Sequence, residues 1–145
     1  MNMFKKNGGF TLVELIVVIA ILAILAGVAI PVYSGYIKEA NKTADDQVIE
    51  AINTAVAAAV SMEGKDVADA STYISGTFDA TTGVLTLAKV DDADAKVDDD
   101  IWANFIQFNG VATAQLDYYK TPADVQAELD GGIVVSASST DDSTT

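Results

Sequence analysis

The feature that most constrains this chain is a single carboxylate, Glu14, near the start of an apolar segment of membrane-spanning length. Residues 10–32 make a run of 23, and at about 1.5 Å per residue a helix of that length crosses a hydrocarbon core of ~30 Å. A carboxylate in hydrocarbon is costly, so Glu14 needs a partner or a task. No other charged residue lies between Asn7 and Ile37. A cation would arise if the chain were cut before Phe10, because the cut creates a new α-amine.

The composition narrows the range of functions. The chain has 145 residues, enough for one modest domain and a helical anchor, with eight lysines, no arginine, 21 acidic residues and a net charge of −13. So acidic a surface repels phosphate backbones, and we expect no direct binding of nucleic acid. Cysteine and histidine are both absent, which excludes disulfides, thiolate chemistry and the commonest general base and metal ligand. We therefore expect neither an enzyme nor a cofactor.

Three interpretations of the N-terminal segment are open on these grounds. The first is a plain transmembrane anchor with the lysines of residues 5–6 on the cytoplasmic side, which leaves Glu14 without a role. The second is a secretory signal peptide cut after residues 27–29, although its apolar core would exceed the usual ~7–15 residues. The third is a short basic leader that ends at Gly9 and is cut before Phe10.

A family resemblance supports the third interpretation. The run Gly9-Phe10-Thr11-Leu12-Val13-Glu14 and the apolar stretch after it resemble the class III signal of type IV prepilins and related pseudopilins. The resemblance implies cleavage between Gly9 and Phe10 by a prepilin peptidase, and then N-methylation of Phe10. It also implies that Glu14 of an incoming subunit pairs with the Phe10 amine of a subunit already in the filament. The alternative is a tolerated acid at a helix start, exposed to lipid headgroups.

Gly27 and Pro31 are a second pair of candidate site residues. A proline inside a helix removes one N–H donor and crowds the carbonyl four residues earlier, which here belongs to Gly27. We expect the helix to kink or to unwind locally at these two residues. The resemblance implies such loosening when the subunit leaves the lipid and enters a helical array.

Apolar residues continue at helical period beyond Pro31. The stripe recurs at every fourth position, namely Ala40, Ala44, Val48, Ile52, Val56 and Val60. Lys42 and Asp46 form an i,i+4 pair beside this stripe. Gly64 suits the residue that follows a helix C-terminus, so one helix is predicted from about Phe10 to Met62. Two helices separated by a break at residues 31–35 are the alternative.

The rest of the chain predicts strands and one short helix. Two hairpins, a helix and a last strand are expected at residues 73–90, 105–119, 121–129 and 133–135. The second hairpin would turn at Asn109-Gly110, and Thr121 with Pro122 would begin the helix. The resemblance implies an α+β fold in which the long N-terminal helix packs on an antiparallel sheet. The expected regions are a leader (1–9), a transmembrane and filament-core helix (10–33), an amphipathic helix with the sheet domain (34–135) and a mobile tail (136–145).

An acidic run precedes the second expected hairpin. Three of its carboxylates have the short spacing and the oxygen chemistry that suit Ca²⁺, namely Asp92, Asp94 and Asp98. The EF-hand pattern fails, because Lys96, Val97 and Ala103 stand where it needs an oxygen ligand, a glycine and a bidentate acid. The run therefore favours a solvated loop, with a weak calcium site as the alternative.

Taken with these features, the resemblance implies a structural subunit of a type IV pilus, a surface filament for adhesion, motility or DNA uptake. The partners implied by the resemblance are further copies of the chain, the prepilin peptidase, the assembly platform with its ATPase, and the cytoplasmic membrane. The precursor would lie in that membrane with a cytoplasmic N-terminus, and the product would be extracellular. Two alternatives stay open: a pseudopilin of a type II secretion or competence machine, and a membrane-tethered acidic module that binds Ca²⁺.

Overall fold

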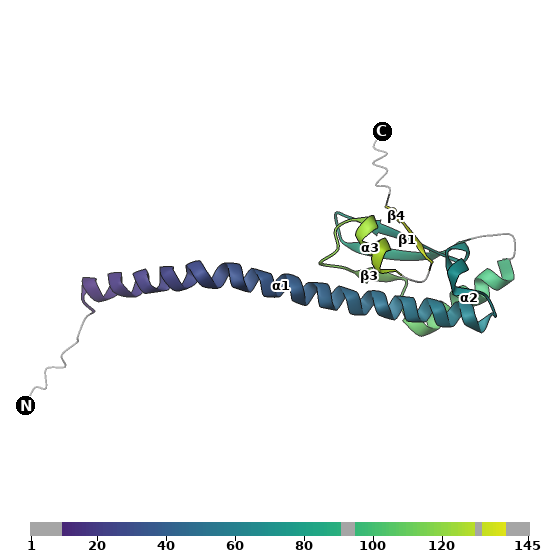
Figure 1. Cartoon of the computed structure of the whole chain (residues 1–145), viewed down its shortest axis with the longest axis horizontal. Helices are drawn as coiled ribbons and strands as arrows, with labels where there is room; N and C mark the ends of the chain where they lie inside the picture. The colour runs from purple at the N-terminus through teal and green to yellow at the C-terminus, as the bar shows by residue number, and fades with distance from the viewer. Residues whose placement is uncertain (1–9, 91–94, 130–131, 139–145) are drawn as a thin grey trace, which may run out of the picture. The chain divides into compact units, whose positions relative to one another are not determined.

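A computed structural model describes residues 10–90, 95–129 and 132–138, except for the side chains of residues 95–98. Its elements in chain order are α1 (Leu12–Met62), the 3₁₀ helix η1 (Val67–Thr72), β1 (Ile74–Asp79), β2 (Val84–Lys89), α2 (Ala95–Asn109), β3 (Thr113–Gln115), α3 (Pro122–Glu128) and β4 (Val134–Ala137) (Figure 1). The fold is α+β, as the sequence predicts. The chain divides into two compact units, residues 1–38 and 39–145, and α1 contributes to both.

α1 is one continuous helix, so the alternative with two separate helices is wrong. Pro31 lies inside it, and the Ser34 hydroxyl donates a hydrogen bond to the Pro31 carbonyl oxygen at 2.9 Å. The kink expected at Gly27 and Pro31 stays a prediction.

The C-terminus of α1 is closed by a glycine, as the sequence predicts. Gly64 has a φ of +67°, a conformation that glycine adopts at little cost. Its N–H donates to the Ser61 carbonyl at 3.0 Å, and the Lys65 N–H donates to the Val60 carbonyl at 3.2 Å. These two bonds form a Schellman motif, which satisfies carbonyls that the helix end would otherwise leave free.

The second half of α1 supplies one wall of the hydrophobic core. Its buried residues are Asp45, Ile49, Ile52, Ala55, Val56, Ala59 and Val60. The apolar ones pack in a single cluster with residues of the sheet, α2 and α3. The predicted stripe is right from Val48 onward, but Ala40 and Ala44 are exposed. The buried face begins instead at Asp45, because a loop of the domain presents hydrogen-bond donors there.

The sheet has four strands in the order β3-β2-β1-β4. β1 and β2 form the first predicted hairpin, with Ile74 opposite Lys89 and Asp79 opposite Val84. β4 pairs with β1 in parallel, so the sheet is mixed and the expectation of a fully antiparallel sheet is wrong. A hairpin forces two strands to be antiparallel, whereas β4 joins β1 after a long crossover that includes two helices.

The second predicted hairpin is wrong, because residues 105–108 belong to α2. Ile101 and Phe105 are completely buried and lie one helical turn apart, so the apolar residues follow a period of four rather than two. Asn109-Gly110 ends this helix instead of turning a hairpin. Gly110 has a φ of +78°, and the Asn109 side-chain amide donates to the Val111 carbonyl. What remains of the second strand is β3, which pairs with β2.

The short helix is confirmed, and so is a last strand, although β4 extends two residues into the region predicted as the tail. Thr121 caps α3 by accepting a hydrogen bond from the Asp124 N–H at 3.2 Å, and Pro122 occupies the first turn. Val125 and Leu129 enter the core. The 3₁₀ helix η1, which begins after the capping residue Asp66, has no counterpart in the sequence prediction.

Candidate functional site

The start of α1 is a capping box built from Thr11 and Glu14. The Glu14 N–H donates to the Thr11 hydroxyl oxygen at 3.3 Å, and the Thr11 N–H donates back to Glu14 Oε2 at 2.8 Å. The Thr11 hydroxyl also donates to Glu14 Oε2, at 2.7 Å. In this arrangement a residue before the helix and one in its first turn satisfy each other's free N–H groups.

The capping box gives Glu14 a role within its own chain that sequence reasoning missed. The signal was present as Thr-x-x-Glu immediately before an apolar run. The interpretation of Glu14 considered only its charge and a partner on Phe10. The structure brings Glu14 to Thr11, while the Phe10 side chain is 90% exposed. Gly9, on the other side of the expected cut, lies outside the described residues.

Within the described residues of the first unit, the helix presents an exposed apolar surface. Large apolar side chains are exposed at Phe10 and along α1 from Leu12 to Ile37. The most apolar window of the helix has a mean hydropathy of 3.1, and none of it is buried. By length and composition this helix qualifies as a membrane span. Gly27, Pro31 and Glu14 all lie on it.

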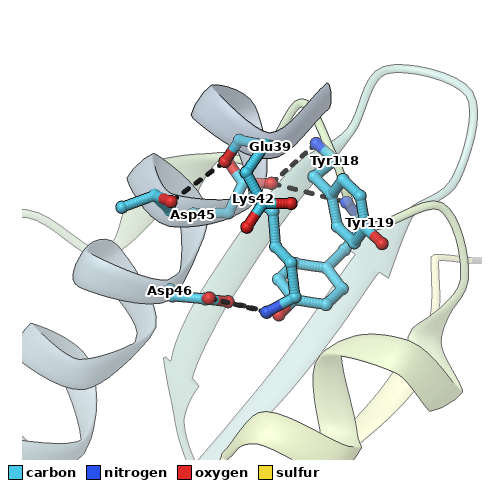
Figure 2. Close-up of polar contacts among 7 residues, drawn as sticks. Glu39, Lys42, Asp45, Asp46, Tyr118 and Tyr119 are labelled. Atoms are coloured by element: carbon cyan, nitrogen blue, oxygen red, sulfur yellow. Dashed lines mark hydrogen bonds and ion pairs between the residues drawn. The ribbon is translucent and has the colours of Figure 1, made fainter. Parts of the chain in front are cut away.

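A second polar constellation joins the other half of α1 to the loop after β3. Asp45 is only 3% exposed, and its carboxylate accepts hydrogen bonds from three successive backbone N–H groups, those of Asp117, Tyr118 and Tyr119, at 3.2, 2.7 and 3.4 Å. Figure 2 shows the bonds from Tyr118 and Tyr119. Successive backbone N–H groups form a concave site for an anion. Asp45 fills that site, and it holds the loop against the helix.

Asp46, the next residue, completes the constellation. It accepts hydrogen bonds from Lys42 at 2.7 Å and from the Tyr119 hydroxyl (Figure 2), so the predicted Lys42–Asp46 pair is confirmed. The Lys42 ammonium also lies 5.9 Å from the centroid of the Tyr118 ring, within the range of a cation–π contact. No pattern in the sequence indicates that these side chains meet residues more than 70 positions away.

These contacts shift the ionisation of the group. The hydrogen bond from Lys42 and then that from Tyr119 lower the pKa of Asp46. Burial and then the contact with Asp46 raise the pKa of Tyr119, and the bond to Asp46 raises that of Lys42. All three groups therefore keep their ordinary charge states at neutral pH. Lys42, Asp46 and Tyr119 are therefore suited to anchoring rather than to proton exchange near pH 7.

The calcium candidates cannot be located in the structure. Asp92 and Asp94 lie outside the described residues, and so does the side chain of Asp98. Within the part of the chain that the structure describes, no three carboxylates converge as a metal site would require. The calcium alternative thus stays a prediction.

Comparisons with known proteins agree with the N-terminal signal. Residues 4–30 match a family model described as the prokaryotic N-terminal methylation motif. The chain is 40% identical over 68 residues to a fimbrial protein of Pseudomonas aeruginosa, covering 47% of this chain and 44% of the relative. It is 49% identical over 57 residues to the type IV major alpha-pilin of Moraxella bovis, covering 39% and 35%. It is 47% identical over 51 residues to the prepilin peptidase-dependent protein D of Escherichia coli strain K12, covering 35% of each.

The chain spans less than half the length of these curated relatives. No solved structure gives a significant match. The N-terminal motif, the relatives and the α+β fold with its long N-terminal helix nevertheless agree with one another. Together they support a protein of the type IV pilin kind, with the resemblance concentrated in the N-terminal segment.

Proposed function

We propose that this chain is the structural subunit of a type IV pilus, which polymerises through its N-terminal helix. The observation that carries the proposal is the uncovered apolar half of α1 with Glu14 in its first turn. Apolar surface of that extent is stable either in lipid or against further apolar surface. Copies of the same helix supply such a surface, because each exposes the same side chains.

Processing before Phe10 would create the cation that the segment lacks. The prepilin peptidase cuts between Gly9 and Phe10, and methylation keeps the new amine positively charged. Before the cut the chain is held in the cytoplasmic membrane, with its basic leader on the cytoplasmic side. After assembly the sheet domain faces the outside of an extracellular filament.

The two oxygens of Glu14 allow it to serve the helix and the filament together. Its hydrogen bonds to Thr11 all use Oε2, and among the described residues Oε1 has no partner. We assign Oε1 to the Phe10 amine of a neighbouring subunit. An ion pair in apolar surroundings is favourable only with close geometry, so one register between neighbouring helices is selected over all others.

The kink proposal fits the same transition. Gly27 has no neighbouring atom within 4 Å of the position that a side chain would take, and Pro31 cannot donate a helix hydrogen bond to it. A loosened turn at these residues would let the N-terminal part of α1 change its direction when it moves from lipid into the filament.

The test is Glu14→Gln in the full chain, expressed with its assembly machinery. Glutamine also suits the third helical position of a capping box, so the substitution removes the charge and keeps the cap. We expect a subunit that starts at Phe10 and carries one methyl group by intact mass, but no filaments by electron microscopy. Glu50→Gln is the matched control, because Glu50 is an exposed acid on the same helix, and this variant should form normal filaments.

Two results would overturn the proposal. Normal filaments from Glu14→Gln would show that the charge pair does not direct assembly. An unaltered chain that keeps residues 1–9, or that begins at Ile30, would remove the α-amine at Phe10 and with it the partner of Glu14.

A further inference from the structure

The outward face of the sheet carries a row of hydroxyl groups that crosses all four strands. The strand register places Thr113 opposite Thr86, Thr86 opposite Thr77, and Thr77 opposite Ser136. Side chains alternate between the two faces of a sheet, and the alternate residues Phe78, Leu85 and Val135 are buried in the core. The hydroxyl row therefore lies on the solvent side.

A hollow of about 260 Å³ lies over one part of this row. It is lined by Thr77, Asp79, Thr82, Val84, Thr86 and Ser138. Ser138 reaches it because the strand pairing extends past β4, where the Ser138 N–H donates to the Phe78 carbonyl at 3.0 Å. The volume lies just below the ~300–1,000 Å³ typical of pockets for drug-sized ligands, so a single small ring is a suitable occupant.

Three hydroxyls of the hollow are available for a ligand. The Thr82 side chain bonds to Asp79. Among the described residues, no protein group binds the hydroxyls of Thr77, Thr86 or Ser138. Each can donate one hydrogen bond and accept two. Val84 adds a small apolar surface between them.

Asp79 is the one charged residue of the lining. Its Oδ1 atom accepts hydrogen bonds from the backbone N–H groups of Thr81 and Thr82 at 2.8 and 3.3 Å. These bonds fix the carboxylate at the end of β1, together with side-chain hydrogen bonds from Thr82 and Thr81. They also lower the pKa of Asp79, so that it remains an ionised acceptor at neutral pH.

We propose that this hollow binds the ring of a neutral saccharide. A saccharide offers hydroxyls that both donate and accept, and apolar C–H groups that suit Val84. An anionic ligand is disfavoured, because Asp79 and the net charge of −13 repel it. A divalent cation is disfavoured as well, since a calcium site takes six to eight oxygen ligands and usually several carboxylates, whereas the lining holds one carboxylate.

The probes for this site are neutral methyl glycosides of glucose, galactose, mannose and N-acetylglucosamine. The full chain, in a zwitterionic detergent without sugar headgroups, is studied by saturation-transfer NMR with each probe at millimolar concentration. We expect saturation transfer to at least one probe, and weaker transfer to the anionic sugar sialic acid. Binding in this assay does not depend on filament formation, so it is tested separately from the pilus function.

Two threonine variants decide where the probe binds. Thr86→Val keeps the shape of the side chain and removes one hydroxyl from the hollow, and valine is well accepted in strands. We expect it to raise the dissociation constant about three- to tenfold. Thr113→Val removes a hydroxyl of the same row outside the hollow and should leave the dissociation constant unchanged. No transfer to any neutral probe, an equal loss in both variants, or stronger transfer to sialic acid would overturn the proposal.

Discussion

Gln126 and Val135 meet at the free edge of the sheet, where Gln126 Oε1 accepts a hydrogen bond from the Val135 N–H at 2.6 Å. The same side-chain amide donates through Nε2 to the Ile133 carbonyl at 2.7 Å. Gln126 therefore binds one N–H and one C=O group on the outer side of β4, the groups that an added strand would use. Unpaired edge groups act as templates for other chains, so Gln126 shields this edge.

Gln126→Ala should destabilise the domain and open that edge. Val135 is 9% exposed, and leaving its N–H without a partner costs about 1–3 kcal/mol. We expect a lower midpoint of thermal unfolding and a larger share of oligomers in detergent solution, measured by calorimetry and by light scattering. Gln47→Ala is the control, because Gln47 is exposed on α1 and should change neither quantity. An unchanged midpoint for Gln126→Ala would refute the shielding role.

Asp45 offers a second prediction, on the attachment of the loop to α1. Asp45→Ala would leave three backbone N–H groups without their acceptor in a buried position. We expect a loss of about 2–4 kcal/mol in the free energy of unfolding, since groups bonded to a charged partner contribute more than neutral ones. Denaturant titration of the full chain in detergent measures it.

Asp45→Asn sharpens this test. The amide has the same shape as the carboxylate, but it offers one acceptor oxygen and turns its NH₂ group toward backbone donors. We expect it to cost nearly as much as Asp45→Ala. If Asp45→Asn unfolds like the wild type, the packing of the side chain rather than its hydrogen bonds holds the loop.

The pair of Tyr119 and Asp46 predicts how stability depends on pH. The folded-state pKa of Tyr119 lies above its ordinary value of 10.0, so its contribution is complete below pH 10 and is lost as the pH rises further. Asp46 has a folded-state pKa below its ordinary value of 3.8, so its contribution is complete above that pH and is lost on acidification. The midpoint of thermal unfolding should therefore fall at both the acidic and the alkaline end of the pH range.

Tyr119→Phe isolates the alkaline part of this dependence. Phenylalanine keeps most of the buried surface of Tyr119, which is 5% exposed, and has no group to titrate. We expect the variant to be less stable at neutral pH, because Asp46 loses a hydrogen bond, and to show a smaller decline above about pH 10. An equally steep alkaline decline in the variant would assign it to other groups, Lys42 among them.

Local signals in the sequence predicted much of the fold. Three predictions depended on a few adjacent residues, and each was right. They are the end of α1 at Gly64, the hairpin of β1 and β2, and the start of α3 at Thr121-Pro122. The failure at residues 105–108 has a physical cause. A short apolar run fits a buried strand or one turn of a buried helix, and only the burial of both Ile101 and Phe105 decides between them.

Features that join distant segments were beyond such reasoning. The parallel pairing of β4 with β1 and the contact of Asp45 with the loop after β3 both depend on how the chain returns to the core. Asp45 is buried although the predicted stripe had Ala44 at this turn of the helix. Three backbone donors compensate the burial of the Asp45 charge. The capping box of Thr11 and Glu14 is different, since it was readable from the sequence and was missed because only the charge of Glu14 was considered.

The two roles of Glu14 can be separated by changing Thr11 instead. Thr11→Ala removes the capping hydroxyl and leaves the carboxylate in place. We expect it to cost about 0.5–2 kcal/mol at the helix start, seen as faster amide hydrogen exchange over residues 12–15, while filaments still form. Thr11→Ser keeps a hydroxyl and should restore slow exchange. If Thr11→Ala abolishes filaments as completely as Glu14→Gln, then the ordered helix start, rather than the charge of Glu14, is what assembly requires.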